Sequence, residues 1–134
     1  LLTPTLMPAR QASDSAGASQ PASASASPTA VKLPVDADAM RIVREGMRQG
    51  VTKGIATAIN FPFVQPAAKT GTAEVGARKE YQNAWMIGFW PYDNPKYAFA
   101  VVLDRLPAGT LVGGASVMYD FFNWMHENAP EYLQ

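Results

Sequence analysis

Apolar residues recur with helical spacing along residues 37–49, directly after Asp36, whose side chain suits the N-cap position of a helix. Charged residues, among them Arg44 and Arg48, fill the opposite arc of the helical wheel. The pattern predicts an amphipathic helix with its apolar arc on a core and its basic arc in solvent. Two glycines in the apolar arc would let the helix lie close to a sheet. The apolar arc consists of Ala39, Met40, Ile42, Val43, Gly46, Met47 and Gly50.

A second helical pattern covers residues 116–128 and stops before Pro130. Two adjacent stripes along it are apolar, which predicts a wide buried arc. His126 lies on the other side of the wheel near the helix C-terminus, where the helix dipole favours its charged form. We expect it to be a surface histidine without a catalytic role. The two stripes are Val117, Phe121 and Trp124, and Met118, Phe122 and Met125.

Three segments between these helices have the composition and alternation of strands: residues 67–75, 84–90 and 96–104. The charged loop 76–80 joins the first two, and the turn 91–95 makes a hairpin of the last two. Large and small side chains alternate along the third segment, so one sheet face is expected to be large and the other small. We expect a helix against the small face. The large residues are Tyr97, Phe99, Val101 and Leu103, and the small ones are Ala98, Ala100 and Val102.

The predicted fold class is α+β, with a three-stranded antiparallel sheet flanked by helices. Three strands make a thin sheet with an unpaired hairpin edge. We therefore expect the last strand to pair with strands encoded upstream. The chain begins at Leu1 in mid-pattern, without an initiator methionine, and is interpreted as the C-terminal piece of a longer polypeptide.

The N-terminal quarter differs in composition. Residues 1–10 are apolar with two prolines, which predicts an extended segment joined to something upstream. Residues 11–30 hold seven Ala and six Ser and no Val, Ile, Leu or aromatic residue, so little apolar surface is available for burial. We expect 11–33 to be a flexible Ala/Ser/Pro-rich loop and 34–134 to carry the helix–sheet–helix unit.

Composition narrows the classes of function. Eleven basic residues balance eleven acidic ones, which argues against binding to nucleic acid or an anionic membrane surface. The absence of cysteine excludes disulfides and thiolate catalysis. A single histidine argues against a protein metal site, and no cofactor is expected. The longest apolar runs fall far short of the roughly 20 residues that span a bilayer.

The candidate chemistry lies in a short polar run on the first predicted strand, Lys69-Thr70-Gly71-Thr72-Ala73-Glu74. Side chains alternate across a strand, so Thr70 and Thr72 share one face and Lys69 lies on the other. Gly71 has no Cβ, which lets a ligand or another backbone approach closely. A cation, two hydroxyls and a glycine suit an anionic ligand bound along an extended backbone. The alternative is an exposed edge strand protected from aggregation by a lysine.

This run and its surroundings resemble the end of the transpeptidase domain of a class B penicillin-binding protein, nearest the elongation-type branch that maintains cell shape. A lone K-T-G is weakly specific, whereas K-T-G-T-A-E followed by the hairpin and terminal helix at the right distances is fairly specific. The other matching segments are Ala84-Trp85-Met86-Ile87-Gly88-Phe89-Trp90-Pro91, Asp93-Asn94-Pro95-Lys96-Tyr97-Ala98, the Gly113-Gly114-Ala115 turn, Arg44-Glu45-Gly46-Met47 and Leu2-Thr3-Pro4-Thr5-Leu6.

The resemblance implies a β-lactamase/transpeptidase-like fold and peptidoglycan cross-linking by serine acyl transfer. Lys69 would keep the site electropositive. With the hydroxyls of Thr70 and Thr72 it would hold the terminal carboxylate of a D-alanyl-D-alanine stem peptide or the carboxylate of a β-lactam. The backbone N–H of Thr72 would be one oxyanion-hole donor. Gly71 would let the substrate lie antiparallel to the strand. The family further implies an N-terminal membrane anchor, an extracytoplasmic, periplasmic location and partner proteins in cell-wall synthesis.

Only the third of the family's motifs, S-x-x-K, S-x-N and K-T-G, is present. No serine begins either of the first two, so the acylated serine is expected upstream of Leu1 and the chain alone is expected to be inactive. Ala68 stands where the family often has glycine, and Asn83 where histidine is frequent. The alternatives are a serine β-lactamase or D,D-carboxypeptidase on the same fold, and a non-catalytic β-lactam-sensing or structural module.

Overall fold

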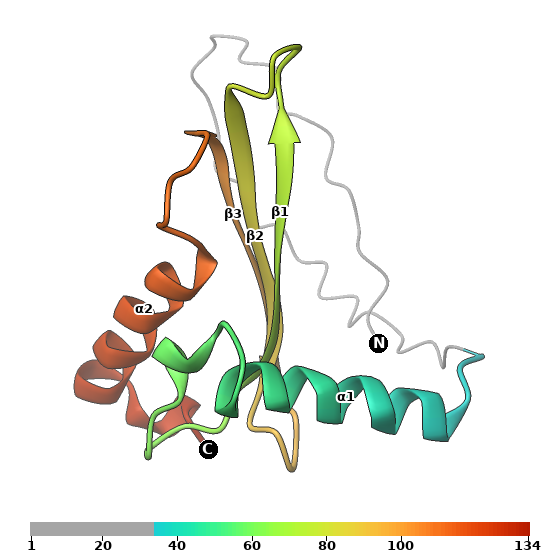
Figure 1. Cartoon of the computed structure of the whole chain (residues 1–134). Coiled ribbons are helices and arrows are strands. Elements are labelled where there is room, and N and C mark those ends of the chain that lie inside the picture. Colours follow the sequence, from blue (N-terminus) through green and yellow to red (C-terminus); the bar gives the residue numbers. More distant parts are fainter. Residues whose placement is uncertain (1–33) are drawn as a thin grey trace, which may run out of the picture. The chain divides into compact units, whose positions relative to one another are not determined.

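The computed structural model describes residues 34–134, of which 37–134 form one compact unit. The predicted segments 1–10 and 11–33 therefore lie outside the described residues. Two helices flank three strands (Figure 1), which confirms the α+β fold class. No helix in the described part of the chain is long and apolar enough to cross a membrane. The elements are α1 (Ala37–Thr52), the 3-10 helix η1 (Thr57–Ile59), β1 (Ala67–Val75), β2 (Tyr81–Trp90), β3 (Tyr97–Pro107), α2 (Gly114–Asn128) and the 3-10 helix η2 (Pro130–Tyr132).

The three strands form one antiparallel sheet in the order β1-β2-β3. Their positions agree with prediction, except that β2 begins at Tyr81 and β3 continues to Pro107. A bulge interrupts the β2–β3 pairing between Gln82 and Ala84. Within residues 34–134, β1 and β3 each pair with a neighbour on one side only. Pairing of β3 with strands encoded upstream stays a prediction.

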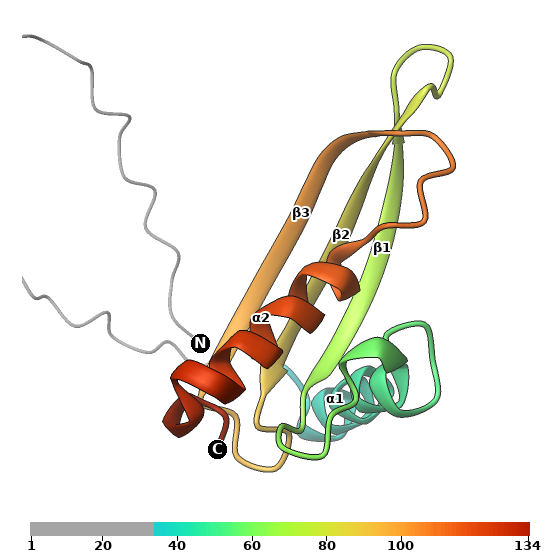
Figure 2. The same cartoon turned by 90° about the vertical axis from the view of Figure 1, so that its left-hand side faces the viewer.

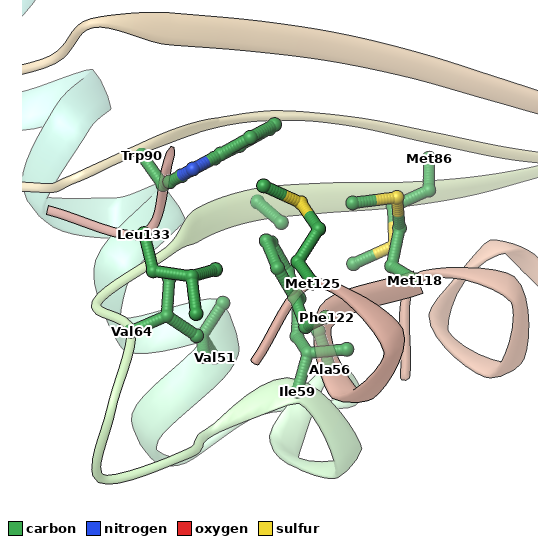
Figure 3. Packing of buried hydrophobic residues seen from close by; sticks show 11 residues of the cluster. Val51, Ala56, Ile59, Val64, Met86, Trp90, Met118, Phe122, Met125 and Leu133 are labelled. Atoms are coloured by element: carbon green, nitrogen blue, oxygen red, sulfur yellow. The ribbon is translucent and has the colours of Figure 1, made fainter. Parts of the chain in front are cut away.

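The hydrophobic core lies between one face of the sheet, α2 and the end of α1 (Figures 2 and 3). Phe122 is fully buried at its centre, with its ring edge-on to the ring of Trp90 at a centroid distance of 5.2 Å. Burying a side chain of this size stabilises the fold by about 1.5–3 kcal/mol. The indole N–H of Trp90 donates to the backbone oxygen of Tyr132 at 2.8 Å, so the buried ring keeps its hydrogen bond. The buried members of the core are Val51, Ala56, Ile59, Val64, Ala68, Met86, Trp90, Met118, Phe122, Met125 and Leu133.

The prediction that a helix covers the small face of β3 is wrong. Tyr97, Phe99 and Val101 pack against the core on the α2 side, and the small residues between them are exposed. The cause lies on the neighbouring strand. A Cβ built on Gly88 of β2 would lie 2.4 Å from the Phe99 ring, so this ring occupies the space above a glycine. Phe99 of β3 therefore fills the space that Gly88 of β2 leaves.

The wide buried arc predicted for the second helix is only half right. Met118, Phe122 and Met125 are buried against the sheet. The neighbouring stripe of Val117, Phe121 and Trp124 is exposed, with 57% of the Trp124 surface accessible. One stripe of α2 therefore contributes to the core of the described residues, and the other is an apolar surface.

Helix α1 begins at Ala37 and continues to Thr52, beyond the predicted end. One of its two glycines lies where close approach was predicted. A Cβ on Gly50 would lie 2.8 Å from the backbone oxygen of Ala68 on β1, whereas a Cβ on Gly46 would meet nothing within 4 Å. Only Val51, in the last turn, is fully buried, so α1 contacts the sheet mainly through its C-terminal half.

The predicted division of α1 into a buried apolar arc and a solvated basic arc is wrong. Ile42 and Val43 of the apolar arc are 62% and 56% exposed. From the basic arc, Arg44 donates to the backbone oxygen of Tyr92 at 2.8 Å, and Arg48 donates to that of Pro66 at 2.8 Å. The physical reason is that an arginine stem packs on apolar surface while its guanidinium satisfies backbone carbonyls.

Arg44 also lies over two aromatic rings, 5.5 Å from the centroid of Phe89 and 5.8 Å from that of Tyr92. Beside it, the Tyr92 hydroxyl donates to Glu45 at 2.9 Å. Hydrogen bonds from Gln49 and then from Tyr92 lower the pKa of Glu45 below its usual value of 4.5. The same hydrogen bond raises the pKa of Tyr92 above 10.0. Together these contacts fasten α1 to the turn between β2 and β3.

Candidate functional site

A pocket of about 240 Å³ opens beside the Lys69–Thr72 run, on the side of the sheet that carries α2. We call it the threonine pocket, because Thr70 and Thr72 of β1 form one wall. The connection from β3 to α2 forms another wall; Figure 2 shows this connection passing in front of β1 and β2 before α2 begins. The lining residues are Ile55, Thr70, Gly71, Thr72, Gln82, Ala84, Trp85, Thr110, Leu111, Val112, Gly113, Gly114, Ala115 and Ser116.

The register of the sheet explains why the two threonines point to this side. Thr70 pairs with Met86, and Thr72 pairs with Ala84. Directly paired residues share a face of the sheet, and Met86 and Ala84 are both buried on the α2 side. The predicted common face of Thr70 and Thr72 is therefore confirmed.

Lys69 lies on the opposite face, as predicted, and the structure does not bring it into the threonine pocket. Its ammonium group donates to the backbone oxygen of Thr70. Lys69 lines a second hollow of about 240 Å³, the lysine pocket, with Gly46, Gly50, Ile55, Ala56, Ala68 and Thr70. Thr70 and Ile55 belong to both pockets. The two hollows therefore meet at β1, which is an edge strand within the described residues.

Gly71 lies between the two threonines, and the fold does not require a glycine there. A Cβ on Gly71 would meet only the Cβ of Trp85, at an ordinary contact distance of 3.8 Å. Gly114 at the start of α2 is the opposite case, because its Cβ would lie 2.4 Å from the Cβ of Met86. Packing thus explains Gly114 and leaves Gly71 unexplained, which is the result expected if the space above Gly71 serves a ligand.

The chemistry of the threonine pocket is that of a binding site. Among residues 34–134, its lining offers hydroxyl and amide groups and contains no Lys, His, Asp or Glu. Such groups hold a polar or anionic ligand by hydrogen bonds but give a nucleophile no general base. Ser116 illustrates this, because it lines the pocket at the start of α2 and no basic side chain of the described residues lines the pocket with it.

The polar residues around the run have structural partners. Glu74, the last residue of the run, pairs with Lys79 of the β1–β2 loop at 2.6 Å. The Asn83 side chain accepts a hydrogen bond of 2.8 Å from the backbone N–H of Arg105 at the bulge. Ala68 is buried beside α1. The two departures from the family pattern, Ala68 and Asn83, therefore both have places in the packing of the sheet.

His126 lies on the exposed side of α2, as predicted. Its ring stacks on that of Phe63 with centroids 4.0 Å apart. It does not line the threonine pocket or the lysine pocket.

Sequence reasoning did not identify one segment that lines the threonine pocket, the connection between β3 and α2. Only the Gly113-Gly114-Ala115 turn entered the family resemblance. This connection lies near β1 because the β2–β3 hairpin brings the end of β3 back toward that strand. Such a long-range arrangement is not contained in any local sequence pattern.

Comparison with solved structures finds transpeptidases with the same fold. Penicillin-binding protein 2B from Streptococcus pneumoniae is 26% identical, with a TM-score of 0.58 over 71% of this chain and 17% of that chain. The transpeptidase domain of the FtsI4 D,D-transpeptidase from Legionella pneumophila is 25% identical, with a TM-score of 0.55 over 71% and 36%. The D,D-transpeptidase domain of a peptidoglycan glycosyltransferase from Eggerthella lenta is 27% identical, with a TM-score of 0.50 over 64% and 19%.

The present chain thus spans between 17% and 36% of the length of these three chains. A comparison with curated proteins gives no match. The family model of the penicillin binding protein transpeptidase domain matches residues 2–122, nearly the whole chain. With the threonine pocket on its K-T-G strand, the chain belongs to the penicillin-binding protein transpeptidase domain family.

Proposed function

We propose that the protein containing this chain is a serine D,D-transpeptidase that cross-links peptidoglycan, and that this chain supplies its carboxylate-binding strand. The observation that carries the proposal is the pair of threonines on β1, an edge strand of the sheet that residues 34–134 form, facing a pocket in a member of the transpeptidase family. An edge strand leaves alternate backbone groups free for an extended ligand alongside it.

In this proposal the hydroxyls of Thr70 and Thr72 donate to the terminal carboxylate of the D-alanyl-D-alanine stem peptide, or to the carboxylate of a β-lactam. Lys69, on the other side of the same edge, supplies positive charge. A charge pair at about 4 Å gains roughly 4 kcal/mol at an effective dielectric of about 20, before desolvation is subtracted. Gly71 gives the ligand backbone room to lie antiparallel to β1.

The reaction is acyl transfer through a serine that this chain does not contain. The serine hydroxyl oxygen attacks the carbonyl of the penultimate D-alanine, the peptide C–N bond breaks, and D-alanine leaves with a proton. The amino group of an acceptor stem peptide then attacks the ester, forms the cross-linking amide and returns the hydroxyl. We assign one oxyanion-hole donor to the backbone N–H of Thr72, and loss of such a donor typically slows a reaction by about 100- to 1000-fold.

The cellular setting follows from the same proposal. A transpeptidase that cross-links peptidoglycan acts on the extracytoplasmic side of the cytoplasmic membrane. We propose that the protein is anchored there through a region outside this chain and works with other cell-wall synthesis proteins in cell-shape maintenance.

Labelling with a fluorescent penicillin tests the proposal in the intact protein. We expect covalent labelling of the wild type and labelling slowed by at least about tenfold in Lys69→Ala, since a charge-assisted contact is worth roughly 1.5–3 kcal/mol. The matched control is Lys96→Ala, an exposed lysine at the β2–β3 turn, which lines neither pocket. Equal labelling of Lys69→Ala and wild type would contradict the role of Lys69, and an unlabelled wild type would contradict the function itself.

A further inference from the structure

The side chain of Gln82 uses both ends of its amide on the connection that walls the threonine pocket. Its Nε2 donates to the backbone oxygen of Thr110 at 2.7 Å. Its Oε1 accepts from the backbone N–H of Gly109 at 3.3 Å. Gln82 lies on β2, is half-buried and itself lines the pocket. One side chain of the sheet thus forms hydrogen bonds with two successive residues of the connection.

Apart from Gln82, local contacts hold this part of the connection in the described structure, among them a hydrogen bond of 2.7 Å from the Thr110 hydroxyl to the Pro107 oxygen. Leu111 is fully exposed and Val112 is 53% exposed, so apolar packing contributes little there. Gly109 has a φ of +83°, the left-handed conformation that favours glycine, and a turn places the Thr110 N–H 3.1 Å from the Pro107 oxygen. Before this turn, the backbone N–H of Ala108 donates to the backbone oxygen of Glu80 at 3.0 Å. After it, the chain is fixed again at Gly114, which packs on Met86.

We infer that Gln82 is a positioning residue that holds the 109–113 wall against the K-T-G strand, so that the threonine pocket is formed before the ligand arrives. The inference rests on the proposed function of the same pocket. Gln82 acts through the wall, because its amide is already occupied by the connection. It therefore differs in role from Thr70 and Thr72, whose hydroxyls contact the ligand.

A preformed wall affects binding more than chemistry. A loop that must be ordered during binding adds an entropic cost to the noncovalent complex, while the reacting atoms themselves are unchanged once the complex exists. Loss of Gln82 is therefore expected to raise the dissociation constant of the complex that precedes acylation and to leave the acylation rate constant within that complex nearly unchanged.

The test uses the intact protein with Gln82→Leu, which keeps side-chain size and removes both hydrogen bonds. Stopped-flow acylation by benzylpenicillin separates the dissociation constant from the acylation rate constant. We expect the dissociation constant to rise by about tenfold, the effect of roughly one net hydrogen bond, with the rate constant within about twofold of wild type. The matched control is Gln49→Leu, which removes an exposed amide bonded to Glu45 on α1, and wild-type values are expected for it.

A second variant and a second measurement keep the inference testable if Gln82→Leu does not fold. Gln82→Glu keeps the acceptor for the Gly109 N–H and loses the donor to Thr110, so it is expected to raise the dissociation constant as well. Hydrogen exchange without ligand is expected to accelerate at the amides of 109–113 in either variant and not in Gln49→Leu. Wild-type exchange and a wild-type dissociation constant in a folded Gln82 variant would overturn the inference while leaving the proposed function intact. A wild-type protein that penicillin does not acylate would overturn the proposed function. Hydrogen exchange at the amides of 109–113 would still show whether Gln82 holds this segment in place.

Discussion

At the scale of single residues, Gly71 offers a test of the proposed ligand site, because the fold does not require a glycine at this position. The structure has room for a side chain there, with the nearest contact at 3.8 Å. We predict that Gly71→Val leaves the unfolding midpoint of the intact protein unchanged or slightly raised, since β-branched residues favour strands. We also predict that it slows acylation by penicillin by at least about tenfold, because the isopropyl group, on the Trp85 side of the strand, crowds a ligand backbone that lies along the edge of β1.

Gly88 provides the control for this prediction. Its Cβ would lie 2.4 Å from the Phe99 ring and 2.5 Å from the backbone oxygen of Ala67. Overpacking of this kind typically costs about 1–3 kcal/mol, so Gly88→Ala is expected to lower the unfolding midpoint. A Gly71→Val protein that unfolds as early as Gly88→Ala, or that reacts with penicillin at the wild-type rate, would contradict the ligand role of Gly71.

The same residues show how far the sequence predicts the site. The period of two in a strand was sufficient to assign Thr70 and Thr72 to one face and Lys69 to the other. Gln82 was not predictable, because its partners Gly109 and Thr110 lie 27 and 28 residues away and the contact depends on how the hairpin returns. Residue type and local spacing identify candidate binding groups, whereas the residues that hold a wall in place emerge from tertiary structure.

At the scale of elements, α1 is attached to the sheet by a residue that the sequence pattern assigned to solvent. Arg44 donates to the Tyr92 backbone oxygen and covers the Phe89 ring. We predict that Arg44→Ala lowers the free energy of unfolding by about 1–3 kcal/mol, the combined size of a charged hydrogen bond and a partly desolvated cation–π contact. Chemical denaturation of the intact protein measures this.

The control for Arg44 lies one turn earlier on the same helix. Arg41 pairs with Asp38 at 3.5 Å, and both side chains are mostly exposed. Exposed pairs contribute little, so Arg41→Ala is expected to change the unfolding free energy by less than about 0.5 kcal/mol. Equal effects of the two substitutions would mean that Arg44 does not fasten α1 to the turn.

The hydrogen bond between Tyr92 and Glu45 gives the same attachment a pH dependence. Because the pKa of Glu45 is lowered in the folded state, first by Gln49 and then by Tyr92, its stabilising contribution is present above pH 4.5 and is lost as the pH falls through the lowered pKa. The pKa of Tyr92 is raised, so its contribution is present below pH 10.0 and is lost as the pH rises through the raised pKa.

We predict that Tyr92→Phe moves the pKa of Glu45 back toward 4.5 without restoring it fully, because the hydrogen bond from Gln49 remains. Nuclear magnetic resonance titration of the Glu45 carboxyl carbon measures the shift. An unchanged Glu45 pKa in Tyr92→Phe would show that this hydrogen bond does not form in solution.

Element positions were more predictable than element faces. The strands and helices were located to within a few residues because periodicity, turn residues and caps are local signals. Which face is covered is not local. Phe99 faces α2 because Gly88 on the next strand leaves space, and Ile42 is exposed because Arg44 and Arg48 make the contacts with the rest of the unit.

At the scale of the whole molecule, the outer edge of β3 is the place where the sheet can be extended by a further strand. The chain spans at most 36% of the length of the transpeptidase structures described above, and β3 pairs only with β2 among residues 34–134. We predict that β3 pairs on its other side with a strand encoded upstream. In the intact protein, hydrogen exchange at successive amides of residues 97–107 is then slow throughout. Fast exchange at every second amide would show that β3 is a free edge.

The most direct test of the account concerns the threonine pocket as a carboxylate site. We would measure acylation of the intact protein, wild type and the double variant Thr70→Val, Thr72→Val, by benzylpenicillin and by its methyl ester, which lacks the negative charge. The double variant keeps the shape of both side chains and replaces each hydroxyl group with a methyl group. We predict that it reacts at least about 100-fold more slowly with the acid and nearly as fast as wild type with the ester, since each of the two lost charge-assisted hydrogen bonds is worth roughly 1.5–3 kcal/mol. A variant that discriminates between acid and ester as strongly as wild type would contradict the assignment of Thr70 and Thr72 to the carboxylate.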